Sequence, residues 1–534
     1  PLPSTGKWYW EYKVPTTATD GSNGWMTGIA YSNLDYAQDI NSNSTGLYGR
    51  QTRGKYNNSS SDPVTDNHFS TPSDNDIFQF AYDANSQALY TGRNNTWELS
   101  ANPSTGANPN WTGVASGGFP MVGSYGSNRY VILNCGQQGF SYTPPTGYKA
   151  LSSRNIPPNS PSIIKPQKHF DTLTWTGAST VNSRVISGLA FQPDWVWIKC
   201  RSHSSYGGGL YYHHNVWDSV RGPGNASSSG AGKNLCPNNS TVEGSTNNIF
   251  TGFYGHVSSF NKDGFTVQRK SGEPPLYTDE NSKTYVAWCW KAGGTAVSNS
   301  DGSITSSVSA NTEAGFSVVT WTGSGADASI GHGLGKKPQA IFVKNRSATD
   351  NWRVWWKDIT VGDGYALVLN DSTGVYTGTD KWYNSPNGND TTTTTFGVSD
   401  DGSTNRSGEL FVGYCWTSIP GYSKIGTYTG NGNADGTYVH LGFRPAWLMV
   451  KKTSGANSWV IFDAKRSTTN LVDDYLIAEG YDAEATSANV SLDFLSSGFK
   501  FQSGYDIVNA GTYAFMAFAE QPGTTPFETF PNAR

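Results

Sequence analysis

Short segments in which hydrophobic and polar residues alternate recur along the whole chain, and each of them predicts a β-strand. A two-residue period places successive side chains on opposite faces of a sheet. In the N-terminal part, the predicted strands are residues 7–14, 24–30, 76–83, 87–92, 119–122 and 130–134. No window in this part has the 3.6-residue period of an amphipathic helix. We therefore expect an all-β fold.

From residue 170 onward the pattern repeats three times. Each copy opens with Thr-Trp-Thr-Gly or Thr-Tyr-Thr-Gly, continues with a proline that begins an apolar strand ending in lysine, and closes with an aromatic strand. The copies place these elements at residues 174–177, 193–199 and 285–290, at 320–323, 338–344 and 411–416, and at 427–430, 445–451 and 513–518. Proline and lysine are six residues apart each time. Such a register indicates a repeat array, which more often presents a surface than catalyses a reaction.

These patterns divide the chain into five predicted parts. Residues 1–151 form a β-sandwich, and residues 152–169 form a linker with four prolines, which stiffen the chain and remove hydrogen-bond donors. Three duplicated β units follow at residues 170–296, 297–421 and 422–534. We expect the repeats to superpose, with Pro193, Pro338 and Pro445 at equivalent strand starts, where a missing N–H is tolerated.

The composition fits a rigid, aromatic-rich β protein in an extracellular setting. Only 15% of the 534 residues are charged, whereas 19 Trp, 29 Tyr and 24 Phe supply large side chains for strands. A net charge of −4 without a Lys/Arg run argues against nucleic acid as a partner. No apolar stretch approaches the roughly 18 to 20 residues of a membrane span. No signal peptide is visible, and an N-terminal anchor upstream of Pro1 is left open.

The five cysteines do not form a disulfide framework, because their number is odd and their spacings are long. Cys289 and Cys415 occupy the same repeat position inside aromatic strands, so we predict that both are reduced and buried. Cys135, in the strand at residues 130–134 and its flank, is interpreted in the same way.

Three groups of residues suggest chemistry, and each also has a structural interpretation. His203, His213 and His214 lie among tyrosines, but no recognisable ligand spacing accompanies them, which favours a polar aromatic loop over a metal site. Asp218 with Arg221, and Asp463 with Arg466, recur in the first and third repeats. A glycosidase carboxylate is the functional alternative, and a structural salt bridge is favoured.

Several Asp-Gly sequences resemble the beginnings of calcium loops, at residues 20–23, 301–303 and 400–403. None continues into the twelve-residue pattern that ends in glutamate, and Asp-Gly is also the commonest hairpin signal. Turns are therefore favoured, and we predict no catalytic residue, no metal and no cofactor. No nucleophile elbow, phosphate loop or paired-cysteine metal motif is present.

The N-terminal part resembles the SPRY domain, and more closely the SPRY modules of tailed-phage structural proteins. The resemblance rests on GKWYWEY, GIA, LYGRQTRGKYNN, NDIFQFAYDANSQALYTGRNNTW and YVILNCGQQGFSYTPPTGYKAL, which occur in this order over about 150 residues. It implies a concanavalin A-like β-sandwich that binds partners through loops at one end and is not an enzyme. We expect ligand contacts from two long loops, at Tyr48, Arg50, Arg53, Tyr56, Trp97 and Trp111; packing of the sandwich edge is the alternative.

The repeated part is similar to a module of tailed-phage virion proteins, notably from phages of marine cyanobacteria. Such proteins often end in Phe-Ala-Glu-x-Pro-Phe and Asn-Ala-Arg, which correspond here to residues 518–522 with 526–527 and to residues 532–534. The short insertion between residues 522 and 526 departs from that pattern.

The two resemblances imply a virion surface protein, assembled in the host cytoplasm, with other virion proteins and a host glycan or receptor as partners. A tail fibre or appendage that mediates host attachment is the expected function. A capsid decoration or head fibre protein and a polysaccharide depolymerase are the alternatives. Phage appendages of this kind imply a homo-oligomer, and we expect a trimer that contacts through the repeat array.

Overall fold

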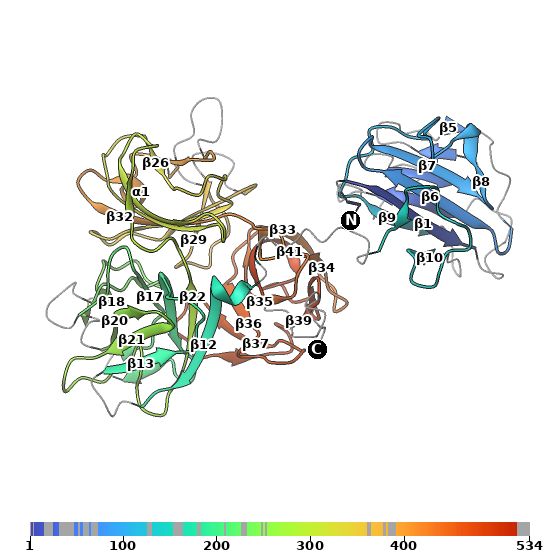
Figure 1. Ribbon diagram of the computed structural model, residues 1–534. Coiled ribbons are helices and arrows are strands. Elements are labelled where there is room, and N and C mark those ends of the chain that lie inside the picture. The colour runs from blue at the N-terminus through green and yellow to red at the C-terminus, as the bar shows by residue number, and fades with distance from the viewer. Residues whose placement is uncertain are drawn as a thin grey trace. The chain divides into compact units, whose positions relative to one another are not determined.

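The protein folds as two compact units, Pro1–Asn159 and Ser160–Arg534, and strands make up nearly all of the regular secondary structure described in them (Figure 1). The all-β prediction is confirmed. The computed structural model describes residues 2–3, 5–14, 25–30, 47–51, 54–56, 64–65, 73–124, 131–152, 163, 165–178, 183–207, 210–225, 232–246, 249–250, 254–359, 365–377, 381–382 and 391–520. Within these ranges, no helix is long and apolar enough to span a membrane.

The N-terminal unit is a sandwich of two sheets. The first has the order β10-β1-β6-β7-β8, with β11 also pairing with β1, and the second has the order β5-β4-β3-β2-β9. The first sheet comprises β1 (Lys7–Lys13), β6 (Ile77–Asp83), β7 (Ala88–Arg93), β8 (Thr96–Trp97), β10 (Ile132–Asn134) and β11 (Lys149–Ala150). The second comprises β2 (Trp25–Ala30), β3 (Leu47–Gln51), β4 (Gly54–Tyr56), β5 (Val64–Thr65) and β9 (Phe119–Ser124).

Alternation along β1 gives the two faces of this sandwich. Trp8, Trp10 and Tyr12 point into the core between the sheets. The hydroxyl of Tyr12 donates to backbone carbonyls of Gly28 and Met121 in the second sheet, at 3.1 and 3.0 Å. On the opposite face, buried Glu11 accepts hydrogen bonds from the Tyr9 hydroxyl and from two backbone N–H groups near residue 141.

The C-terminal unit consists of three lobes, which correspond to the three predicted repeats and are called lobes 1, 2 and 3 (Figure 1). Each lobe has a larger sheet in which the closing strand lies between the opening strand and the proline strand. In lobe 1 this sheet has the order β12 (Phe170–Thr176), β22 (Thr284–Trp290), β14 (Trp195–Cys200), β17 (Asn215–Asp218).

Lobes 2 and 3 repeat this order and extend it. The larger sheet of lobe 2 is β23 (Val297–Asn299), β24 (Ser306–Asn311), β25 (Phe316–Thr322), β32 (Leu410–Trp416), β27 (Ala340–Asn345), β28 (Arg353–Trp356), β29 (Tyr365–Val368), β30 (Tyr376–Thr377). That of lobe 3 is β33 (Ser423–Asn431), β41 (Ala510–Ala519), β35 (Pro445–Lys452), β36 (Trp459–Asp463), β37 (Asp474–Ile477), β38 (Ala485–Thr486).

A smaller sheet covers the outer face of each larger one. These smaller sheets are β13 (Ser183–Ser187), β21 (Gly264–Gln268), β20 (His256–Asn261) in lobe 1, β26 (Ala328–Gly331), β31 (Thr395–Val398) in lobe 2, and β34 (Tyr438–His440), β40 (Gly498–Phe501), β39 (Leu492–Leu495) in lobe 3. Lobe 1 also has the two-stranded pairs β15 (Ser205–Gly207) with β16 (Leu210–Tyr211) and β18 (Ser245–Thr246) with β19 (Ile249–Phe250), and lobe 2 the short helix α1 (Gly402–Asn405).

The prediction of equivalent prolines is confirmed by strand register. The residue two positions after each proline pairs with the last aromatic residue of the closing strand. These pairs are Trp195 with Trp290, Ala340 with Trp416, and Trp447 with Phe518.

The glycine that ends each Thr-x-Thr-Gly motif has a steric reason. A Cβ at Gly177, Gly323 or Gly430 would lie 2.0 to 2.3 Å from backbone atoms of the loop that leads into the closing strand of the same lobe. Only glycine permits this close approach, which explains why the motif recurs.

Each larger sheet is buried on both faces. Odd and even positions of a strand belong to different cores: along β14, Trp195 and Trp197 join a core shared by all three lobes, whereas Val196 and Ile198 join the core of lobe 1. The shared core contains side chains at the equivalent positions of β27 and β35 and of the closing strands β22, β32 and β41. The three lobes therefore form one hydrophobic unit rather than a row of separate domains.

The cysteine prediction is confirmed for two residues and corrected for a third. Cys289 and Cys415 are free thiols with no exposed surface, and burial raises the pKa of each. Cys135 is half-buried, because it lies beyond the end of β10 at the margin of the sandwich core.

We predict that a thiol reagent at pH 8 labels Cys135 first and leaves Cys289 and Cys415 unlabelled until the protein unfolds. The thiolate is the reactive form, and burial opposes both its formation and its access to reagent. Mass spectrometry of peptides after timed labelling measures this order. The variant Cys135→Ser should lose the early label; early labelling of Cys289 or Cys415 in the native protein would contradict the prediction.

Candidate functional site

The six residues predicted to contact a ligand do not all lie in loops. Tyr48 and Arg50 lie in β3 and Tyr56 lies in β4, where Gly49 pairs with Tyr56, so these three belong to a hairpin of the second sheet. Arg53 lies outside the described residues. The loop placement of this group is thereby corrected, and its role in binding stays a prediction.

The two tryptophans of the group differ. Trp97 ends β8, is half-buried, and packs at the edge of the cluster around Tyr9. Trp111 is only 4% exposed and belongs to the sandwich core, where its backbone pairs with Leu89. Its ring contributes to packing because the loop that carries it folds back over the sheet, so the alternative interpretation describes Trp111 better than a ligand contact does.

The histidine cluster of lobe 1 is a hydrogen-bonded structural element. His214 is fully buried; its Nδ1 accepts from the indole N–H of Trp197 at 2.9 Å, and its Nε2 lies 3.0 Å from the carbonyl oxygen of Ile477. Nδ1 of His213 lies 2.8 Å from the amide of Asn238. Burial lowers the pKa of His213 to about 4 and that of His214 well below its usual range. In the described part of the chain, no group of three His, Cys, Asp or Glu side chains could hold a metal ion.

The Asp-Gly sequences that the structure describes are turns and caps. Oδ1 of Asp401 accepts the backbone N–H of Ser403 and caps α1, and Lys381 pairs with its other oxygen. The backbone N–H of Asp301 donates to the side-chain oxygen of Asn299 at 3.0 Å. Residues 20–23 lie outside the described residues.

A lysine at the end of each proline strand is buried in the same way. Lys199, Lys344 and Lys451 have no exposed surface, and each Nζ donates to the carbonyl of the following residue at 2.7 to 3.0 Å. Each also donates to a backbone carbonyl of another lobe. These acceptors are Tyr481 of lobe 3 at 3.2 Å, Ser240 of lobe 1 at 3.2 Å and Ser372 of lobe 2 at 3.1 Å, respectively.

A second hydrogen bond joins the same lobes at each interface, and its acceptor carbonyl lies four residues before the acceptor of the lysine. An aromatic N–H at the start of the strand after the proline strand faces the carbonyl of the neighbouring lobe. The pairs are His214 with Ile477 at 3.0 Å, Trp352 with Cys236 at 2.8 Å, and Trp459 with Val368 at 2.9 Å. Lobe 1 thus donates to lobe 3, lobe 3 to lobe 2, and lobe 2 to lobe 1, which closes a ring.

A third hydrogen bond, between backbones, completes each interface. In each interface a backbone N–H donates to the carbonyl two residues after the buried lysine. This N–H lies seven residues after the residue that accepts from the aromatic N–H. The pairs are Glu484 with Arg201 at 2.7 Å, Glu243 with Arg346 at 3.1 Å, and Val375 with Thr453 at 3.4 Å. The constant offsets show that the three interfaces are copies of one another.

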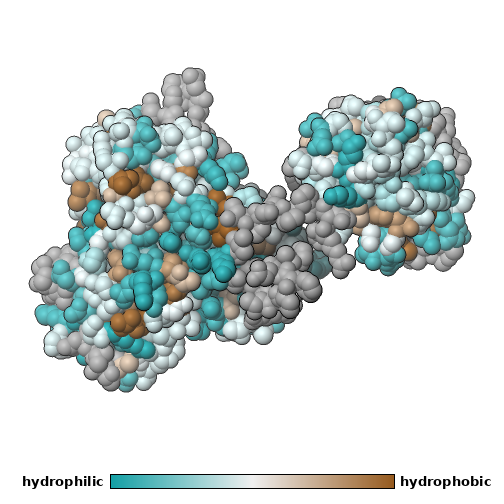
Figure 2. Space-filling model, in the orientation of Figure 1, coloured by the Kyte–Doolittle hydropathy of each residue, from teal (hydrophilic) through white to brown (hydrophobic). Residues whose placement is uncertain are grey.

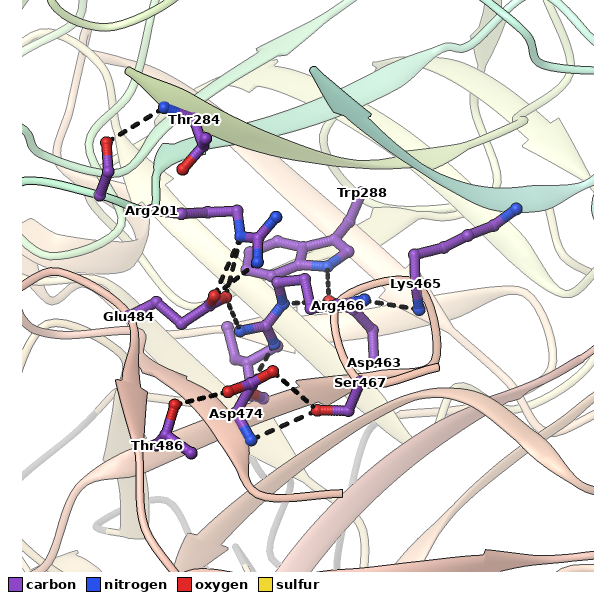
Figure 3. Close-up of polar contacts among 12 residues, drawn as sticks. Arg201, Thr284, Trp288, Asp463, Lys465, Arg466, Ser467, Asp474, Glu484 and Thr486 are labelled. Carbon is purple, nitrogen blue, oxygen red and sulfur yellow. Dashed lines mark hydrogen bonds and ion pairs between the residues drawn. The ribbon is translucent and has the colours of Figure 1, made fainter. Parts of the chain in front are cut away.

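Two of the three interfaces add a chain of buried and half-buried charges. Between lobes 1 and 3, Arg201 and Arg466 converge on Glu484, as Figure 3 shows, with closest N–O distances of 2.6 and 2.8 Å. Arg466 also binds Asp463 at 2.5 Å, and the indole N–H of Trp288 donates to Asp463 across the interface at 2.9 Å. The salt-bridge interpretation of the Asp/Arg motif is therefore confirmed.

The interface between lobes 2 and 1 has the same chain at equivalent positions. Arg346 and Arg221 converge on Glu243, Arg221 binds Asp218 at 2.5 Å, and the hydroxyl of Tyr414 donates to Asp218 at 2.7 Å. Burial alone would raise the pKa of Glu243, but the two guanidinium groups lower it to about 2. Both aspartates are fully buried and paired, which removes them from the surface where a glycan substrate would bind.

The third interface, between lobes 3 and 2, replaces these charges with mostly apolar residues. Trp356, Ile359 and Val375 of lobe 2 stand at the positions of aspartate, arginine and glutamate, and Thr453 of lobe 3 at that of the second arginine. Trp356 is buried, and its indole N–H donates to the carbonyl of Gly426 in lobe 3 at 3.3 Å. Buried ion pairs and well-packed apolar residues can stabilise an interface about equally.

Sequence reasoning missed the role of the lysines although their spacing was visible. A lysine at the same place in three apolar strands is a signal, because an isolated buried ammonium is costly. Its partners could not be predicted, since they lie about 80 to 280 residues away in other lobes. Burial lowers the pKa of Lys199 and of Lys451 to about 8 and that of Lys344 to about 7.

Comparison with known proteins gives two similarities. A family model described as "Domain of unknown function (DUF7483)" matches residues 165–522, which span the three lobes. The crystal structure of the SPRY domain of human HERC1 is 16% identical, covering 25% of this chain and 77% of that chain, with a TM-score of 0.20. None of the curated proteins compared matches the chain.

The first prediction from the ring concerns pH. The folded-state pKa of Lys344, about 7, lies below the ordinary value of 10.5 for lysine, so the unfolded chain binds more protons between these two pH values. The free energy of unfolding therefore increases with pH between about 7 and 10, because in this range unfolding takes up a proton at Lys344. The variant Lys344→Met should flatten the increase in unfolding free energy between pH 7 and 9.5, measured by urea denaturation.

The matched control is Lys357→Met in the same lobe, because the Lys357 side chain is 46% exposed. This control should retain the wild-type pH dependence. Equal slopes for Lys344→Met and wild type would contradict a pKa of Lys344 lowered by burial at the interface.

The second prediction concerns the buried charges. Asp463→Leu leaves Arg466 without its closest carboxylate and should lower the unfolding free energy by about 3 to 5 kcal/mol. The double variant Asp463→Leu with Arg466→Met, which resembles the apolar interface, should lose less. Urea denaturation at pH 7 compares the two, and a double variant less stable than the single one would refute this explanation.

Proposed function

The chain belongs to the family described as "Domain of unknown function (DUF7483)", and we propose that it is a non-enzymatic surface protein of a tailed-phage virion. In this proposal it acts as a tail fibre or related appendage that attaches the particle to glycans of the host surface. The C-terminal unit is its rigid body, and the N-terminal sandwich carries binding strands and loops.

The observation that carries the proposal is the use of the buried charges. The ionisable side chains that recur between lobes, three lysines and two Asp-Arg-Glu chains, all contact a neighbouring lobe. Catalytic carboxylates must reach substrate and hold pKa values suited to proton transfer. Residues engaged in closing a ring serve a scaffold instead, which supports a structural role.

The assignment to a virion rests on the sequence resemblances of both parts of the chain. The proposed host glycan fits a chain rich in tyrosine and tryptophan and low in charge, because a sugar offers a flat apolar face beside hydroxyl groups. The alternatives, a capsid-attached decoration protein and a polysaccharide depolymerase, differ in location and in product. A depolymerase releases new reducing ends from host envelope polysaccharide, whereas a binding protein does not.

The proposed homotrimer needs a surface other than the inner faces of the lobes. Those faces are buried within one chain, where they form the shared aromatic core. Chains that associate would use the outer faces of the lobes or the N-terminal sandwich. Most of the described surface visible in Figure 2 is hydrophilic or intermediate, with small hydrophobic patches, and a non-obligate interface is about as apolar as the rest of a protein surface.

We predict that particles carrying Tyr48→Ala, Arg50→Ala, Tyr56→Ala and Trp97→Ala together adsorb to host cells more weakly than wild type. One aromatic contact contributes about 0.5 to 1.5 kcal/mol beyond its buried area, and many copies on a particle mask single changes. Adsorption rate constants measure the effect.

The control combines Gln138→Ala with Lys149→Ala, which alters exposed residues of the same unit. Both variants should be incorporated normally and stay folded. The control should keep the wild-type melting temperature, and the fourfold variant should melt slightly lower because Trp97 packs at the edge of the cluster around Tyr9. Unchanged adsorption of the fourfold variant would favour the capsid-decoration alternative, and reducing ends released by the purified chain would favour the depolymerase.

A further inference from the structure

Lobe 1 carries an insertion that the ring does not need. The segment between the buried lysine and the aromatic donor of the next strand spans residues 345–351 in lobe 2 and 452–458 in lobe 3, seven residues each, but residues 200–213, fourteen residues, in lobe 1. Since seven residues suffice to join the same two hydrogen-bonding groups, the additional seven have another use. Insertions in single repeats often form a binding face.

The insertion contains a hairpin that places an aromatic ring against another lobe. β15 and β16 pair through Ser205 with Tyr211. The ring of Tyr211 packs on the ring of Tyr481 from lobe 3, with centroids 4.3 Å apart and planes inclined by 37°. His213 contacts the same ring of Tyr481 in an edge-to-face arrangement at 5.9 Å.

Tyr481 is specific to this interface. The equivalent acceptor residues at the other two interfaces are Ser240 and Ser372, whose short side chains offer no ring. The aromatic hairpin of lobe 1 and the tyrosine of lobe 3 therefore occur together at one junction of the three.

Tyr481 is held in place and yet exposed. Its carbonyl accepts the hydrogen bond from buried Lys199 at 3.2 Å, and Tyr211 and His213 support its ring. Even so, 39% of its surface is exposed. A fixed ring with an open surface loses little conformational entropy when it binds a ligand, which favours affinity.

We infer that Tyr481 stacks against a sugar ring of a neutral glycan, with Asp482 accepting hydrogen bonds from the sugar hydroxyls. Tyr211 and His213 position the tyrosine ring. This inference rests on the proposed function, because it names the substrate class and a second binding site for host attachment.

The charges around the ring select a neutral sugar. Asp482, next in the chain, is exposed, and its carboxylate disfavours acidic glycans. Glu484 is already bound by two arginines, and the ammonium of Lys199 faces carbonyl groups inside the interface. One ring with a polar neighbour also suits a sugar better than a protein partner, whose interface typically needs about 800 Å² on each side.

The other exposed tyrosine of the hairpin provides a matched control. Tyr206 is 48% exposed and precedes Tyr211 by five positions on the antiparallel hairpin, where Ser205 faces Tyr211. Among the described residues, Tyr211 and His213 contact the ring of Tyr481, and Tyr206 makes no ring contact with it. Replacement of Tyr206 removes an exposed ring of similar size without touching Tyr481.

The test measures binding of the full chain to an immobilised panel of neutral oligosaccharides of glucose, galactose, mannose and N-acetylglucosamine, with sialylated and uronic-acid glycans beside them. Wild type is expected to bind a neutral member. Tyr481→Ala should weaken that binding about tenfold, which corresponds to about 1.4 kcal/mol, while Tyr481→Phe and Tyr206→Ala retain it. Melting temperatures should stay within a few degrees of wild type for all three variants.

The outcomes separate this site from the proposed function. Binding of a neutral glycan that Tyr481→Ala leaves unchanged, or equal losses for Tyr481→Ala and Tyr206→Ala, would overturn the site and keep glycan attachment. Binding only to acidic glycans would likewise overturn the site. Absence of binding to every glycan would overturn both the site and the proposed glycan attachment. A second experiment measures adsorption of particles to host cells whose surface glycans have been removed. If wild-type particles still adsorb and Tyr481→Ala particles do not, Tyr481 contacts a protein receptor, which would also overturn both.

Discussion

The apolar inner faces of the three larger sheets impose the constraint on which the C-terminal unit depends. Each face carries large aromatic or aliphatic side chains on the proline strand and on the closing strand, and within the described ranges these side chains pack against the inner faces of the other two lobes. Fully burying one such side chain stabilises a fold by about 1.5 to 3 kcal/mol. Three lobes arranged around one centre satisfy all three faces at once, whereas a linear stack would leave its terminal faces open.

The polar interactions then determine which lobe meets which. The lysine, the aromatic N–H and the backbone N–H repeat at every interface, so they specify the geometry of contact but not its order. The charged chains distinguish the interfaces: Glu243 pairs with Arg346 and Glu484 pairs with Arg201, while Thr453 offers no positive charge to a carboxylate. A charge placed opposite Val375 or Ile359 would be buried without compensation. The one apolar interface thereby fixes the arrangement of the three lobes.

Sequence reasoning identified the parts of this fold that depend on local pattern. Six strands of the N-terminal sandwich, the three repeats, the equivalent prolines and the buried Cys289 and Cys415 follow from periodicity and spacing, and the six predicted strands agree with the structure within two residues. The residues of β3 and β4 were instead predicted to lie in a loop. The Asp218 and Asp463 salt bridges were also predictable, because arginine follows three residues later in both copies.

What could not be predicted depends on contacts between distant residues. The lysines looked like strand ends until their acceptors in other lobes were known, and Tyr481 had no distinguishing feature before Tyr211 was found against it. Trp111 looked like a loop residue because nothing local shows that its loop returns to pair with Leu89. Closure of the ring is likewise a property of sheet faces, and a repeat pattern alone fits an open array equally well.

Hydrogen exchange of the full chain in increasing denaturant, followed by mass spectrometry, tests the shared core most directly. Amides that open only through cooperative unfolding report the free energy of that event. Because β14, β27 and β35 contribute to one core, their slowest amides should converge on a single free energy and denaturant dependence. Three separate values, with one lobe exchanging while the others stay protected, would contradict the account of a single closed unit.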